Sequence, residues 1–241
     1  MLRILLTGLF IGLCSMKAAA VELLPFQASY VADWKQLAFN GSAERSLQKG
    51  KNTGEWLLSF EASMLVAGMR ESSLLRVENN QIQPLAYNYQ RTGLGKAKKI
   101  EQTFNWQTLQ MQGSEKNKSF TLPLLPGMQD KSSYQLALQP DVASVLKTLH
   151  YTLLDGDDVD VYDFRVLGTE VVDTEVGQLN TVKVERVREP SKSQRKTTLW
   201  FASDWNYLLV KLNQIEKDGK EYTILLEEGM VNGNKVKGLN R

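Results

Sequence analysis

Apolar residues alternate with polar ones along most of the chain. The first clear run extends from Phe26 to Trp34, and a longer one extends from Trp56 to Val66. A period of two places every second side chain on the same side of an extended backbone, which is typical of a half-buried strand. Similar runs, each bounded by turn residues, lie at 85–89, 100–106, 151–155, 159–167, 179–188, 196–201, 208–216 and 222–228. The pattern predicts consecutive antiparallel strands.

The alternation stops in the middle of the chain. Asp130 can cap a short helix that runs through Leu138, and Asp141 follows Pro140 as a cap for a second helix. The second helix would present one apolar face, made by the i, i+3, i+4 and i+7 positions Val142, Val145, Leu146 and Leu149. We expect this helical insertion to lie against the concave side of a curved sheet, where its apolar stripe is buried.

These patterns together predict the fold class. The chain is expected to be mainly all-β, with an antiparallel meandering sheet that curves into an open or partly closed β-barrel around a short central helical insertion. Residues 21–241 are expected to form one domain, with 126–150 as the place for a subdomain junction.

The first twenty residues resemble a secretory signal peptide. Arg3 precedes an apolar run from Ile4 to Met16, and Ala18 to Ala20 offer a small-residue cleavage site. The apolar run is short against the roughly 20 residues needed to span a bilayer. We therefore expect cleavage near Ala20, a periplasmic location, and no membrane-spanning segment afterwards. Lipidation at Cys14 is the alternative, but Leu13 stands where a small side chain is usual.

Removal of the signal peptide changes the charge balance. The full chain has 29 Lys and Arg residues against 27 Asp and Glu residues, and Arg3 and Lys17 lie in the signal peptide. A neutral mature chain lacks the positive field that attracts nucleic acid, so we expect no nucleic-acid partner. Cys14 is the only cysteine and is lost as well. Disulfides, thiolate nucleophiles and cysteine metal sites are therefore not expected in the mature chain.

Few residues offer catalytic or metal chemistry. His150 is the only histidine, and no serine has the Gly-x-Ser-x-Gly setting of a nucleophile elbow. An acidic group, Asp155, Asp157, Asp158, Asp160 and Asp163, lacks the spacing of an EF-hand calcium loop. We expect no metal and no cofactor, and an enzyme is the less favoured class. A pair of carboxylates that act on polysaccharide remains an open alternative, because folding alone sets their separation.

Aromatic side chains provide one candidate binding site. Large apolar residues on the concave face of a curved sheet can hold an acyl chain or another hydrophobic ligand, although they also fill ordinary cores. The candidates that fall in strand patterns are Trp34, Trp56, Tyr87, Tyr89, Trp106 and Trp200.

Basic side chains provide a second candidate site. They flank the turn at Pro190 and Ser191, where they can contact an anionic partner or simply solvate a strand face. The candidates are Arg186, Arg188, Lys192, Arg195 and Lys196.

Four segments of the chain resemble one exported family of Gram-negative envelope proteins, catalogued as domain of unknown function 3108. The segments are Leu122–Asp130 with its Pro-Gly-x-Gln-Asp sequence, Tyr162–Gly168, Gly177–Arg186 and Thr198–Ala202. The resemblance covers roughly Phe26 to Glu228 and implies an envelope location and a β-rich fold. It implies no catalytic residues.

The residues and the resemblance favour a non-enzymatic envelope protein. We expect it to bind a lipid, amphiphile or other hydrophobic ligand on the concave face of its sheet, or to assist envelope assembly with another envelope protein as partner. The carboxylate-pair enzyme and a protein-interaction module that uses a sheet edge or the basic group are the alternatives. The sequence does not determine the oligomeric state.

Overall fold

The computed structural model describes residues 22–34, 41–64, 67–93, 97–116, 118–144, 146–191 and 193–239. The expected signal peptide, its cleavage site and Cys14 lie outside these ranges, as does Lys192. The side chain of Trp34 is also outside the description.

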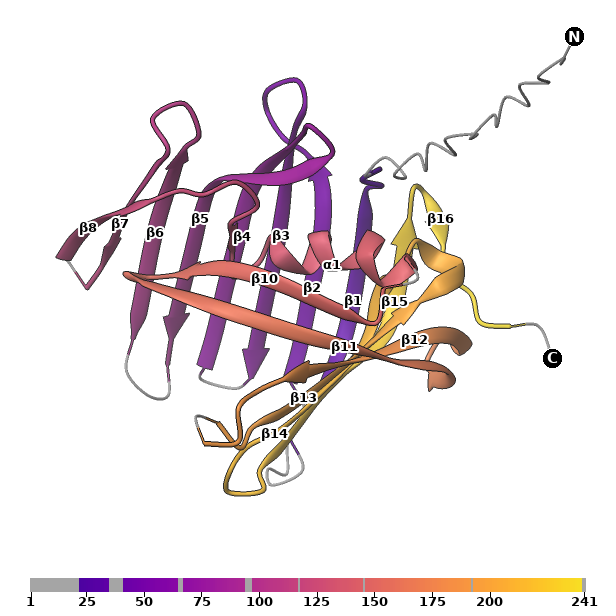
Figure 1. The fold of residues 1–241 in the computed structure, drawn as a ribbon. Helices are drawn as coiled ribbons and strands as arrows, with labels where there is room; N and C mark the ends of the chain where they lie inside the picture. The colour runs from indigo at the N-terminus through magenta and orange to yellow at the C-terminus, as the bar shows by residue number, and fades with distance from the viewer. Residues whose placement is uncertain are drawn as a thin grey trace, which may run out of the picture.

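The described residues form one sheet of 16 strands (Figure 1). The first eight strands are β1 (Phe26–Trp34), β2 (Gly41–Lys49), β3 (Glu55–Met64), β4 (Ala67–Glu78), β5 (Gln81–Thr92), β6 (Lys98–Asn105), β7 (Gln110–Glu115) and β8 (Lys118–Pro123). The other eight are β9 (Gln129–Asp130), β10 (Thr148–Asp155), β11 (Asp158–Thr174), β12 (Gly177–Val187), β13 (Lys196–Ala202), β14 (Leu208–Ile215), β15 (Glu221–Val231) and β16 (Asn234–Lys235).

The sheet consists of two meanders joined side by side. Its order is β8-β7-β6-β5-β4-β3-β2-β1-β15-β14-β13-β12-β11-β10-β9, and β16 pairs with β15. Strand neighbours are antiparallel, except that β9 pairs with β10 in parallel. Because β8 and β9 lie at opposite ends of this order, the sheet is not closed. The predicted fold class, a mainly antiparallel and open β structure with a short central helix, is confirmed.

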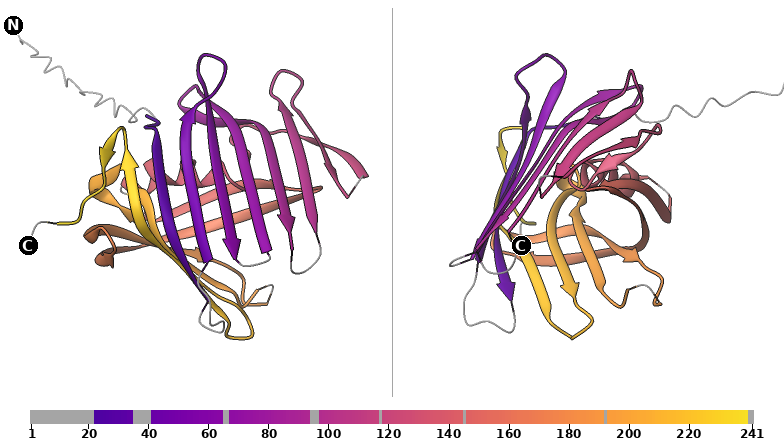
Figure 2. Two further views of the ribbon diagram at one scale, coloured as in Figure 1. Left: turned by 180° about the vertical axis from the view of Figure 1, so that it is seen from behind. Right: turned by 90° about the vertical axis from the view of Figure 1, so that its left-hand side faces the viewer.

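Hairpin turns and bulges determine how the sheet bends. Asn79 and Asn80 alone connect β4 to β5, and both have positive φ angles of 51° and 61°, which a two-residue type I′ turn requires. The register shifts at four places, including Ser29/Tyr30 and Val166/Gly168. Bulges of this kind increase local twist, and the halves of the sheet accordingly do not share a plane (Figure 2).

One helix, α1 (Tyr134–Ala143), occupies the centre of the chain. Together with β10 and β11 it crosses the face of β1–β6 that we call the inner face (Figure 1). No helix in the described ranges is long and apolar enough to cross a membrane.

The prediction of a second helix is wrong. Val142 belongs to α1, Leu146 is exposed in a loop, and Leu149 is the second residue of β10. Leu149, Tyr151 and Leu153 face one side of β10 and are buried. The segment forms a strand despite its helical spacing, because pairing with β11 satisfies its backbone hydrogen bonds and also buries Leu149.

Three clusters of buried apolar residues form the core. The largest lies between β1–β4, the β11–β12 hairpin and β13–β15, and includes Tyr30, Leu58 and Leu136. The second packs α1 against β10–β14, and the third lies under residues 124–128 at the β5–β7 end. The segment between β8 and α1 thus closes the inner face by burying apolar side chains on it.

Candidate functional site

Four of the six predicted aromatic residues lie on or beside the inner face of β3–β6. Trp56 and Tyr87 are buried, whereas Tyr89 and Trp106 are partly buried. Tyr87 donates a hydrogen bond from its hydroxyl to Glu71 Oε1 (2.7 Å), and the Trp106 indole N–H donates to the Pro84 carbonyl (2.7 Å). These side chains mainly pack in the core.

Trp200 lies elsewhere. Its indole N–H donates to Glu170, and the amines of Lys183 and Lys211 lie 5.1 and 4.8 Å from its ring centroid. Along β13, Leu199 packs in the second core cluster, whereas Trp200 packs in the largest one, together with Trp56. The structure therefore gives Trp200, like Trp56, a place in the core.

An apolar surface on the inner face is only partly covered. Its six residues are intermediate in exposure, and we call them the open concave surface: Ala32, Phe60, Ala62, Met69, Leu212 and Ile224. They are continuous across the sheet, because Leu212 opposes Ile224, Ile224 opposes Ala32, and Ala62 opposes Met69.

Small side chains line the middle of this surface. Gly41 opposes Ala32, and Ala43 opposes Ala62, in the region where β1–β3 turn toward β14. Tyr30, on the same side of β1, donates a hydrogen bond from its hydroxyl to the Leu209 carbonyl (2.8 Å).

A polar cluster lies beside this surface under the start of α1. Asp130 is fully buried and accepts the backbone N–H groups of Ser132 and Ser133 on Oδ1, each at 2.7 Å. Its Oδ2 accepts the Ser73 hydroxyl at 2.6 Å. These bonds attach the segment before α1 to β4 and satisfy backbone N–H groups at the start of the helix. Asp130 does this from three residues before the N-cap residue, Ser133.

Two acids of this cluster have strongly raised pKa values. Burial raises the pKa of Glu71 to about 7, against the hydrogen bond from Tyr87, which lowers it. Burial likewise raises the pKa of Asp130 to about 6, against the bonds from Ser73, Ser132 and Ser133. Raised carboxylate pKa values are found in active sites, but the oxygens of Asp130 are engaged by the protein itself, which gives that acid a structural role.

Arg45 is the least expected member of the cluster. It lies on the inner side of β2, opposite Ala28 and Phe60, and is only 4% exposed. Its Nη1 and Nη2 atoms are buried and have no hydrogen-bond partner in the protein. Burial lowers the pKa of this guanidinium, while Tyr30, Tyr134 and Glu71 act in the opposite direction.

The structure brings four of the five predicted basic residues together. Arg186, Arg188, Arg195 and Lys196 line a groove of about 460 Å³ at the β12–β13 turn. Arg188 donates to the Arg195 carbonyl (3.2 Å) and to the Thr197 hydroxyl (3.1 Å). Burial, followed by the charges of Arg186 and Arg195, lowers the pKa of Arg188 to about 10. Lys192 lies outside the described residues.

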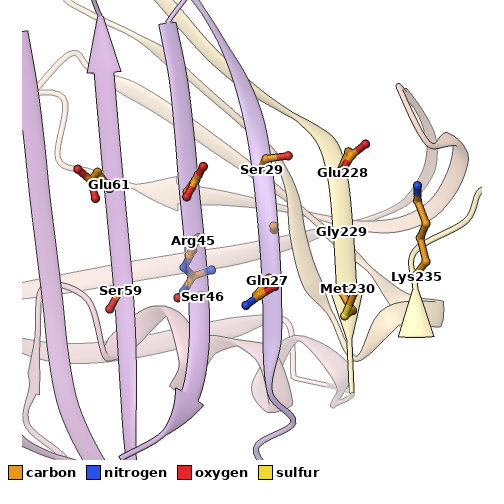
Figure 3. Close-up of a pocket in the computed structure, with 12 residues that line it drawn as sticks. Gln27, Ser29, Arg45, Ser46, Ser59, Glu61, Glu228, Gly229, Met230 and Lys235 are labelled. Atoms are coloured by element: carbon orange, nitrogen blue, oxygen red, sulfur yellow. The ribbon is translucent and has the colours of Figure 1, made fainter. Parts of the chain in front are cut away.

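A second groove, of about 540 Å³, lies on the outer face of β3-β2-β1-β15 (Figure 3). Glu44, Glu61 and Glu228 line it, and Glu44 directly opposes Glu61. All three are exposed, and Glu61 forms an ion pair with Arg70 at 2.7 Å. A general acid for glycoside hydrolysis needs an enclosed setting that keeps its proton, which these exposed side chains lack.

The remaining candidates lie on the surface. His150 Nδ1 is 2.6 Å from Asp163 Oδ1, and both residues lie on paired strands with the histidine exposed. Asp155 accepts the Lys131 amine at 2.6 Å, which ties the β10–β11 turn to the segment before α1. Within the ranges described, no group of three or more His, Cys, Asp or Glu side chains is arranged to hold a metal ion.

Comparison of the sequence with known families decides the family of this chain. Residues 29–227 match the family described as "Protein of unknown function (DUF3108)". The chain belongs to the DUF3108 family. The resemblance inferred from the four sequence segments is thereby confirmed. No curated protein matches the chain.

Two solved structures are similar to this DUF3108 protein to different degrees. A β-barrel-like protein of the domain of unknown function DUF1849 from Brucella abortus is 12% identical, with a TM-score of 0.59 over 88% of this chain and 99% of that one. A protein described as a "putative lipoprotein" from Parabacteroides distasonis is also 12% identical, with a TM-score of 0.33 over 88% of this chain and 97% of that one. The first of these likenesses supports the β-barrel-like fold and nothing further.

Arg45 and Glu71 are not among the residues that the sequence singled out in this DUF3108 chain. Arg45 did have a signal, because Ala43, Arg45 and Leu47 are alternate residues and both neighbours are apolar. An arginine at an apolar position of a strand indicates a buried charge. Glu71 had none, since Met69, Glu71 and Ser73 form no apolar alternation.

Proposed function

We propose that this DUF3108 protein is a non-enzymatic binding protein of the bacterial periplasm that holds a hydrophobic or amphiphilic ligand on its open concave surface. The observation that supports it most is the set of partly exposed apolar residues on the inner face, continuous across β4-β3-β2-β1-β15-β14. A concave, mainly apolar surface with a few polar groups at its edge is the usual form of a site for an apolar ligand.

The signal-peptide pattern of residues 1–20 supports the periplasmic location. An exported carrier of this kind would shield an amphiphile from water, and assisting envelope assembly is one use of that property. The exposed acids of the outer groove give the polysaccharide-enzyme alternative less support than the concave surface gives to ligand binding.

Tryptophan substitution on the concave surface tests the proposal. We expect Ala62→Trp and Ala32→Trp to weaken binding of the neutral fluorescent probe phenylnaphthylamine by about tenfold or more, because each indole would cover part of the open concave surface. A titration of probe fluorescence with purified mature protein measures the change.

A matched control stands next to Ala62 on the same strand. Ser63 is exposed and faces the other way, with its hydroxyl 3.2 Å from that of Ser42. Ser63→Trp should keep wild-type affinity for the probe. Equal affinities in Ala62→Trp, Ser63→Trp and wild type would contradict the proposed site, provided that circular dichroism shows all three folded.

A further inference from the structure

Two arginines inside the curve of the sheet have buried nitrogen atoms without partners. They are Arg45 on β2, through Nη1 and Nη2, and Arg186 on β12, through Nε. Taking a guanidinium out of water is costly unless an anion or an acceptor replaces the lost hydration. The great majority of buried polar atoms in proteins are hydrogen-bonded, so two such arginines in one region call for a shared explanation.

Tyr134, the first residue of α1, is influenced by the charges of both arginines. Burial raises its pKa, whereas the positive charges of Arg186 and Arg45 both act to lower it. Its ring centroid is 5.4 Å from that of Tyr162, and the Arg186 guanidinium carbon lies 3.1 Å from the Tyr162 centroid. The two guanidinium groups, far apart in sequence, thus both exert their charge on the start of α1.

No ion pair joins Arg45 or Arg186 to an acid among the described residues. Glu71, whose charge acts on Arg45, accepts the Tyr87 hydroxyl, and with a pKa of about 7 it is only partly ionised at neutral pH. Asp130 is engaged by Ser73, Ser132 and Ser133. Neither guanidinium group is therefore paired directly with a carboxylate in the part of the chain that the structure describes.

The same region borders the open concave surface. Phe60 lies directly opposite Arg45, and Ala43 is two residues away on the same side of β2 and opposite Ala62. A ligand that placed an anionic group at Arg45 would therefore have its next atoms over Phe60, Ala43 and Ala62. An apolar tail fits there, and a free small ion would leave that surface uncovered.

We propose that Arg45 recognises the anionic headgroup, a carboxylate or a phosphate, of a single-chain amphiphile whose tail lies on the open concave surface, with Arg186 contributing a second positive charge. This inference rests on the proposed function and adds the class of ligand. Planar guanidinium groups bind carboxylate and phosphate in a bidentate way, which gives strong and directional recognition.

Headgroup preference tests the inference without any substitution. Displacement of phenylnaphthylamine should show wild-type protein binding dodecanoate and dodecyl phosphate about ten- to a hundredfold more tightly than dodecanol. Equal affinity for all three would overturn the inference and leave the proposed function standing. Failure of all three to bind would overturn both. Inorganic phosphate alone should compete weakly, and competition as strong as that of dodecyl phosphate would overturn the assignment to an amphiphile.

Substitution then assigns the preference to Arg45. Arg45→Met should remove most of the preference for the anionic compounds while dodecanol affinity stays within about twofold of wild type. Arg195→Met is the control, because Arg195 lies at the turn and pairs with Glu216 at 2.9 Å, and it should keep the preference. An Arg45→Met protein that retains the preference would overturn the role of Arg45. If that variant does not fold, Arg186→Met provides the second test, with a smaller loss expected and an unchanged preference counting against the inference.

Discussion

Asp130→Ala is expected to lower the free energy of unfolding by about 3–5 kcal/mol, the range seen when a buried hydrogen-bond network is broken. The substitution would leave the Ser132 and Ser133 amides and the Ser73 hydroxyl without their acceptor. All three serines are buried, so water cannot replace the carboxylate without opening the structure. The measurement is urea unfolding of the mature protein followed by circular dichroism.

Two further variants make that result specific. Asp130→Asn keeps an oxygen for the two amides and should lose clearly less stability than Asp130→Ala. Asp218→Ala removes an exposed acid of the β14–β15 turn and should not change the unfolding midpoint measurably. Similar stabilities of Asp130→Ala and wild type would show that the attachment of the segment before α1 to β4 does not depend on this carboxylate.

Glu71→Gln is expected to remove much of the pH dependence of stability between pH 4.5 and pH 7. The pKa of Glu71 is raised from 4.5 to about 7 in the folded protein, mainly by burial. Below pH 4.5 the side chain is protonated in both states, and as the pH rises the unfolded state loses the proton first. Wild-type stability should therefore fall through this window, by an amount on the order of 2–3 kcal/mol for a pKa raised from 4.5 to about 7.

Glutamine mimics the protonated acid and still accepts the Tyr87 hydroxyl, so the variant should be more stable than wild type at pH 8 and similar to it at pH 4.5. Asp130 titrates in an overlapping range and leaves a residual slope, since its pKa is also raised, to about 6. Glu61→Gln on the exposed face of the neighbouring strand should keep the wild-type profile. Denaturant unfolding at several pH values measures the free energy of unfolding of each protein. The same pH dependence in wild type and Glu71→Gln would contradict the raised pKa of Glu71.

Much of the sheet could be predicted from alternation. The run from Phe26 to Trp34 is β1 with the same ends, and the runs at 196–201 and 208–216 correspond to β13 and β14 within one residue at each end. Strands with weaker alternation were missed. β2 has Arg45 among its inward residues, and β4 has Glu71 and Ser73. These polar side chains interrupt the apolar alternation, so the pattern did not predict the two strands.

The candidate site was harder to predict than the fold. The basic group around the β12–β13 turn is local in sequence, and four of its members do gather at one groove. The five aromatic residues whose side chains are described do not form one surface, because Trp56 and Trp200 pack in the largest core cluster, whereas Tyr87, Tyr89 and Trp106 belong to the third. Each strand has two sides, and only the complete sheet decides which side of a distant strand faces the same space.

The sequence by itself determined the secondary-structure class, the presence of helix in the centre of the chain and the family, since period-two alternation and turn residues act over a few neighbours. Only the tertiary structure decided that the central segment holds one helix, that Arg45 is buried on the inner side of β2, and that Asp130 joins β4 to the start of that helix. The pairing of β1 with β15 brings the two meanders together across nearly the whole chain. Burial in that arrangement, and not any local motif, raises the pKa of Glu71 and leaves Nη1 and Nη2 of Arg45 without a hydrogen-bond partner in the protein.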